Sequence, residues 1–258
     1  MNASQRIYVV GKVLTAKREV VEAKEVDGVI KKGKTAYNLF VKLPNGTTLS
    51  IRKNIWDSEK EPVKYVIDAT NKLEEIIEKV NNNETVLISK FISANDEGKM
   101  FDWFTSYTNS KDKTSYQLEG FVNIQDFTED DNGNITVHFK KSDKAFEDCA
   151  PTFEATMYIE DVIDNKIILT DGEDNYPNEL TVELAKTPKT QPTVGQGYKF
   201  TLELVRGDVV KKEDTMEELD FEEEAKTEYP DDKLIVKKVG KVTDMVLEGL
   251  AGSTEVDF

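Results

Sequence analysis

The sequence predicts a mainly β protein that contains one long helix. Two observations predict the β class. Short runs rich in β-branched and aromatic residues recur along the 258-residue chain, and turns that contain glycine, asparagine or aspartate separate them. A third observation places the helix, because apolar residues recur at helical spacing in one stretch of the first half.

The first three expected strands are read from two stretches. Residues 5–21, "QRIYVVGKVLTAKREVV", form one long bent strand in which Gly11 is a candidate bulge. Residues 35–55 form two strands around "PNG". Asn45-Gly46 predicts a type I′ hairpin turn, because both central residues of that turn need a positive φ.

The helix and two more strands complete the first half. In residues 65–83 the helical pattern is carried by Leu73, Ile76, Ile77 and Val80. Asp68 or Thr70 is expected to cap its start, and the asparagines end it. Residues 84–94 and 99–108 read as strands. Strand, hairpin, helix and two strands is the order of an OB-fold, so residues 1–115 are expected to form an OB-like β-barrel with one inserted helix.

The remainder divides into a second β region and an acidic end. Residues 116–207 hold a hairpin with "DNGN" at its tip and several short strands, which predict a second small barrel or a sandwich. The tip is not a calcium loop, because Thr128 and Phe139 occupy the positions of its key carboxylates. Residues 208–258 are expected to form an acidic linker and a C-terminal partner-binding tail, with a mildly apolar stretch at 233–252.

The chemistry of the sequence argues against an enzyme. With one cysteine and one histidine, the chain has no disulfide and no thiolate or histidine cluster for a metal. Phosphate-loop and nucleophile-elbow motifs are absent, and His138 lies in an expected strand with no nucleophile assigned to it. We therefore expect no catalytic residues, no cofactor and no metal. Without a long apolar run, a cytoplasmic protein that does not enter membranes is expected, in a host cell if a phage encodes it.

Aromatic and basic residues interleave in the first half, which favours binding to single-stranded nucleic acid. Flat rings stack on unpaired bases, and cations neutralise phosphates. Three lysines lie in a loop bounded by glycines, and the other candidates lie on expected strands. The candidate nucleic-acid-binding residues are Lys31, Lys32, Lys34, Tyr37, Phe40, Lys42, Arg52, Lys53, Trp56, Trp103 and Tyr107.

Charge is distributed unevenly along the chain. Residues 1–120 carry 19 Lys/Arg and 17 Asp/Glu, whereas residues 213–258 carry 5 and 15. The chain closes on "EVDF", in which Glu255, Asp257 and Phe258 place two acids beside an aromatic ring. A weakly basic front and an acidic end are typical of nucleic-acid proteins with acidic tails.

In plan, the chain resembles the single-stranded DNA-binding proteins of bacteria and tailed phages. The resemblance rests on an OB-like body with interleaved aromatics and an acidic tail that ends in Phe. It implies that Glu255, Asp257 and Phe258 recruit replication proteins. The sequence departs from the bacterial tip, which has consecutive acids and Ile-Pro before the Phe. We expect a protein of phage DNA replication or recombination. The alternatives are a virion structural or assembly protein and an acidic DNA mimic that inhibits a host enzyme. The oligomeric state stays open.

Overall fold

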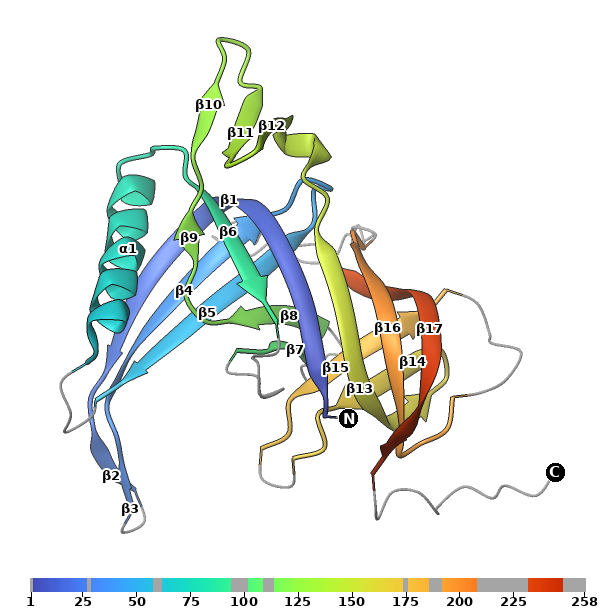
Figure 1. The fold of residues 1–258 in the computed structure, drawn as a ribbon. Coiled ribbons are helices and arrows are strands. Elements are labelled where there is room, and N and C mark those ends of the chain that lie inside the picture. The colour runs from blue at the N-terminus through green and yellow to red at the C-terminus, as the bar shows by residue number, and fades with distance from the viewer. Residues whose placement is uncertain are drawn as a thin grey trace, which may run out of the picture.

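The computed structural model describes residues 2–26, 29–57, 62–93, 102–108, 114–173, 176–185, 192–207 and 232–247. Over these residues the chain is mainly β with one α-helix, α1 (Lys64–Asn81), as predicted (Figure 1). The strands are β1 (Ser4–Val21), β2 (Lys24–Val26), β3 (Val29–Lys31), β4 (Lys34–Lys42), β5 (Thr48–Trp56), β6 (Leu87–Ile92), β7 (Phe104–Thr108), β8 (Thr114–Glu119), β9 (Asn123–Ile124), β10 (Phe127–Glu129), β11 (Ile135–Phe139), β12 (Ser142–Ala145), β13 (Thr152–Ile163), β14 (Lys166–Thr170), β15 (Glu179–Leu184), β16 (Gln196–Val205) and β17 (Lys233–Val246).

The first barrel is closed by strand pairing around a ring. β1 pairs antiparallel with β4 along its second half and with β6 along its first half. β4 pairs antiparallel with β5, and β5 pairs parallel with β8. β9 follows β8 after Gly120 and pairs with β6, which completes the ring. The helix α1 stands between the third and fourth strands of this ring, so the OB-like barrel is confirmed.

The second β region is also a closed five-stranded barrel, with the same connectivity as the first. β13 pairs with β14, β14 with β15, and β13 also with β16, all antiparallel. β17 lies between β16 and β15, antiparallel to the former and parallel to the latter. In both barrels the ring order is therefore first, second, third, fifth and fourth strand, and the third and fifth strands are parallel.

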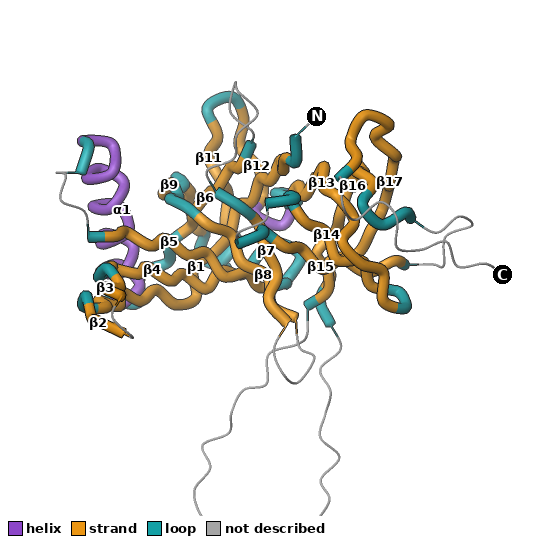
Figure 2. Tube along the Cα trace, turned by 90° about the horizontal axis from the view of Figure 1, so that it is seen from below, coloured by secondary structure: helices purple, strands orange, loops and turns teal. Residues whose placement is uncertain are grey.

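The two barrels are joined side by side. The first residues of β1 pair with β13, from Ser4–Thr156 to Tyr8–Thr152. One hydrophobic core runs through both barrels, and its largest fully buried side chains include Phe104, Phe153 and Phe200. Figure 2 shows β7 and β8 of the first barrel next to β14 and β15 of the second. The three-stranded sheet of β10, β11 and β12 is inserted between the barrels in the sequence.

Two details of the first barrel differ from the sequence-based expectation. The turn between β4 and β5 is not type I′. Gly46 N–H donates to the Leu43 carbonyl, and within this turn only Gly46 has a positive φ, of 83°. That pattern is a type I turn followed by a left-handed glycine. The irregularity in β1 lies between Val13 and Thr15, not at Gly11. Gly11 is needed for close approach, because a Cβ there would lie 2.2 Å from Val41 Cγ1.

The helix begins earlier than the sequence suggests. Its N-cap is Val63, after Pro62, and neither Asp68 nor Thr70 caps it; the Thr70 hydroxyl instead donates to the Val66 carbonyl within the helix. Its end at the asparagines agrees with the prediction, and Asn83 adopts a φ of 62°. Leu73 and Ile76 are buried and close one end of the barrel interior.

The predicted domain boundaries are wrong at two places. A boundary at residue 115 would cut β8, whose pairing with β5 belongs to the first barrel. Residues 233–246, assigned to the tail, form β17, the fifth strand of the second barrel. Leu234 and Met245 of β17 are buried, although its middle is exposed. The acidic residues 208–231 therefore lie between two strands of one barrel and do not begin a tail.

Candidate nucleic-acid interface

One outward face of the first barrel collects most of the candidate side chains. Residues that are paired across a sheet point to the same side. Successive rows across β1, β4, β5 and β8 therefore share this face: Thr15, Phe40, Ser50 and Gln117 in one row, and Lys17, Asn38, Arg52 and Glu119 in the next. The alternate residues of the same strands, such as Leu39, Val41, Leu49 and Ile51, fill the barrel interior. We call the former surface the outer face.

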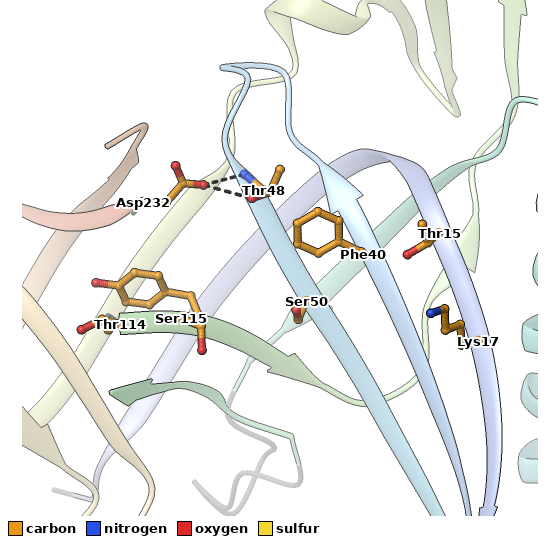
Figure 3. Close-up of a pocket in the computed structure, with 9 residues that line it drawn as sticks. Thr15, Lys17, Phe40, Thr48, Ser50, Thr114, Ser115 and Asp232 are labelled. Atoms are coloured by element: carbon orange, nitrogen blue, oxygen red, sulfur yellow. Dashed lines mark hydrogen bonds between the residues drawn. The ribbon is translucent and has the colours of Figure 1, made fainter. Parts of the chain in front are cut away.

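Two hollows lie on the outer face, and we call them together the groove. The first, of about 350 Å³, is shown in Figure 3 and is lined by Thr15, Lys17, Phe40, Thr48, Ser50, Thr114, Ser115, Tyr116 and Asp232. The second, of about 570 Å³, is lined by Arg52, Thr105, Ser106, Tyr107, Ser115, Gln117, Glu119, Pro177, Asn178 and Glu179. Ser115 lines both hollows, so they are neighbours. The second hollow also reaches residues of the second barrel.

Asp232 forms one end of the first hollow. Its Oδ2 accepts hydrogen bonds from the backbone N–H of Thr48 at 2.8 Å and from the Thr48 hydroxyl at 3.2 Å (Figure 3). Its Oδ1 accepts one from Gly207 N–H at 3.4 Å. Asp232 is buried, with 7% of the residue exposed. It therefore links the start of β17 to the start of β5, across the two barrels.

Basic side chains border the groove along its length. Lys12 and Lys42 are paired on adjacent strands, and Lys17 and Arg52 belong to one row. Lys34 pairs with Trp56 at the far end of β4 and β5, and its Nζ lies 4.8 Å from the Trp56 ring centroid. None of these five cations forms an ion pair within the described part of the chain. Their charge is available to an anionic ligand.

Six of the predicted binding residues lie on the outer face or line the groove: Lys34, Phe40, Lys42, Arg52, Trp56 and Tyr107. Trp56 is 55% exposed and Tyr107 is 71% exposed. Lys31 and Lys32 are exposed just before β4. A hydrogen bond from Asp57 N–H to the Gly33 carbonyl places them near Trp56, at the end of β5.

Three predicted residues are not on this surface. Tyr37 is buried, and its hydroxyl donates to Glu74 Oε1 at 2.5 Å; burial and this hydrogen bond raise its pKa to about 12. Lys53 pairs with Tyr37 across β4 and β5, so it shares the opposite face. The Trp103 side chain packs against the core. These three residues have structural contacts instead of a place on the groove.

Lys53 belongs to a charged cluster that fixes the approach to β7. Asp102 Oδ2 accepts a hydrogen bond at 2.7 Å from Lys90 Nζ, and Asp102 Oδ1 lies 3.7 Å from Lys53 Nζ. Burial lowers the pKa of Lys90, and the bond to Asp102 opposes this change. A Cβ at Gly120 would collide with both Asp102 and Lys90. The cluster therefore anchors the segment that carries Tyr107.

Several groove residues were not predicted from the sequence. Thr15 and Lys17 follow from the alternation of β1 once its register with β4 is known. Ser115 and Gln117 alternate with the buried Tyr116 and Leu118, a signal that was present in the sequence. No local pattern in the sequence identifies Asp232 as a groove residue, because the position of β17 in the second barrel brings it to the groove.

Two other kinds of feature are absent from the described residues. They contain no cluster of three or more histidine, cysteine or acidic residues that could hold a metal ion. Nor do they include a helix with the length and apolar character needed to cross a membrane. Glu255, Asp257 and Phe258 lie outside the described residues. Comparison of the chain with protein-family models and with curated proteins gave no match.

Proposed function

We propose that this protein binds single-stranded DNA along the groove, by base stacking and phosphate neutralisation, and acts in DNA replication or recombination. The observation that carries the proposal is the gathering of Trp56, Phe40 and Tyr107 with Lys34, Lys42 and Arg52 on one outer face. Stacking on aromatic rings accepts any base, and nearby cations follow the backbone.

The geometry favours a single strand over a duplex. Tyr107 is exposed and lines the second hollow, Phe40 lines the first, and Trp56 is exposed on the outer face at the end of β5, beyond Arg52. Only unpaired bases present a free face to such rings. Hydroxyl groups from Thr15, Ser50 and Ser115 line the path between them and suit hydrogen bonds to sugars and phosphates.

The experiment is a titration of labelled oligo-dT with the full-length protein at several salt concentrations. Lys17→Gln, Lys42→Gln and Arg52→Gln each remove one groove cation, and Lys141→Gln removes an exposed lysine from the loop between β11 and β12 as a matched control. For a single strand, each lost phosphate contact should reduce the slope of log K against log salt by about 0.7. The control should leave the slope unchanged.

Three results would contradict the proposal: no binding to oligo-dT, equal binding to duplex DNA, or groove variants with wild-type slopes. Binding to particles in place of DNA would favour a virion protein. Displacement of DNA from a host enzyme would favour a DNA mimic, since the net charge of −16 suits that role.

A further inference from the structure

Tyr176, in the second barrel, is the most exposed of the large hydrophobic side chains among the described residues, at 94%. It precedes Pro177, Asn178 and Glu179, which line the second hollow of the groove together with Tyr107 and Arg52 of the first barrel. Residues 177–179 therefore form one wall of the second hollow, and Tyr176, directly before them, presents an aromatic ring to solvent.

The backbone at Tyr176 is held in an uncommon conformation. Its φ is 78°, in the left-handed region. Residues other than glycine, asparagine and aspartate rarely adopt this region. Asp171 holds a residue on each side of Tyr176, because its Oδ1 accepts hydrogen bonds from Glu173 N–H and Asn178 N–H, and its Oδ2 accepts one from the Asn178 side chain. A strained residue at a wall of a binding groove is a candidate for function.

From these observations we infer that Tyr176 is a stacking platform for a base of the bound single strand, so that the strand passes from the first barrel onto the second. The inference rests on the proposed function and extends it. The path begins at Trp56, crosses the outer face past Phe40, and leaves it between Tyr107 and Tyr176. The second barrel then takes part in binding, although its part of the chain is acidic.

The charge at this end of the groove gives the contact a distinct signature. Glu119 and Glu179 line the second hollow, and Arg52 is its only basic lining residue among those described. Stacking on Tyr176 therefore adds affinity without neutralising a phosphate. Loss of the ring should weaken binding while the slope against salt stays unchanged.

The test uses the full-length protein and oligo-dT of about 6 and about 20 nucleotides, which lie near the lower limit and above the upper limit of the about 4–16 nucleotides that one OB barrel binds. Tyr176→Ala should weaken binding of the longer strand by about 5- to 150-fold and leave the shorter strand nearly unaffected. Tyr176→Trp should restore the loss. Phe91→Ala is the matched control, because Phe91 is an exposed ring on β6 that lines neither hollow.

A second variant separates binding from folding. Tyr176→Gly removes the ring and also suits the positive φ, so the protein should melt no earlier than wild type yet lose the same affinity. Full affinity of the glycine variant, or an equal loss on both strand lengths, overturns the inference. If wild-type protein binds neither strand, the proposed function itself fails. If it binds both strands and Tyr176→Ala binds them equally well, only the inference fails.

Discussion

Replacing Trp56 by alanine should weaken DNA binding far more than it weakens the fold. The ring is 55% exposed, and its described polar contact is the cation–π pair with Lys34 Nζ at 4.8 Å. An exposed pair of this kind contributes about 0.5–1 kcal/mol to stability. Stacking of one base on an aromatic ring contributes about 1–3 kcal/mol to binding. The affinity should therefore fall about 5- to 150-fold, whereas the loss of the cation–π pair should lower the stability by no more than about 1 kcal/mol.

Tryptophan fluorescence provides the assay, because the chain has only two tryptophans, Trp56 and Trp103. Addition of poly-dT should quench the emission of wild-type protein and of Trp103→Phe. Quenching should be lost in Trp56→Phe, whose remaining Trp103 packs against the core. Urea unfolding of each variant checks the fold. Quenching that persists without Trp56 and disappears without Trp103 would refute the assignment of the groove to this face.

Three further predictions concern the scaffold. Gly11→Ala should lower the unfolding free energy by about 1–3 kcal/mol in urea melts, because the added Cβ meets Val41 at 2.2 Å; an unchanged midpoint would show that β1 and β4 separate easily. Asp232→Ala should lower the free energy of unfolding by about 1–3 kcal/mol, since the Thr48 N–H loses its acceptor. Asp232→Asn should lower it less. Equal losses would mean that the charge of Asp232 matters more than its hydrogen bonds. Glu160→Gln should stabilise the protein at neutral pH, because burial, with Glu179 nearby, raises the pKa of Glu160. A raised carboxyl pKa means that the folded state binds the extra proton, so wild-type stability should fall as pH rises through that pKa. The variant should lose this dependence in melts between pH 4 and 7, and a variant that keeps it would refute the assignment to Glu160.

The sequence predicted the first barrel well because its signals are local. A long strand, a Pro-Asn-Gly hairpin and a helix of 18 residues each follow from neighbouring residues. The faces of the strands were also readable in principle. Tyr37 shares one face of β4 with Leu39 and Val41, whereas Phe40 and Lys42 share the other face with Asn38. The two-residue repeat of side-chain direction in a strand thus separates Tyr37 from the outer face. The interleaving of aromatic and basic residues alone does not make this distinction.

The second barrel was only partly predictable, because its closure depends on contacts far apart in sequence. Val242, Met245 and Val246 have near-helical spacing, yet they lie in β17. Pairing with β16 and β15 determines the extended conformation of these residues, and no local pattern in the sequence predicts such pairing. The sequence alone therefore predicts an acidic linker and a tail over residues 208–258, without the barrel strand at 233–246. A truncation near residue 212 would remove a barrel strand together with the acidic charge.

Because β17 pairs with β16 along its length, we expect this fold to persist when the chain is broken before β17. β17 is held along its length by β16, from Lys233–Val205 to Val246–Gln196, and Asp232 secures its start. A protease cut between residues 208 and 231 should give two polypeptides on a denaturing gel that elute as one particle from a sizing column. The protein then becomes a natural split pair, in which a peptide that begins at Asp232 complements a body that ends at Gly207. Such a pair would allow the acidic segment to be removed, or exchanged for neutral residues, while every barrel strand is retained.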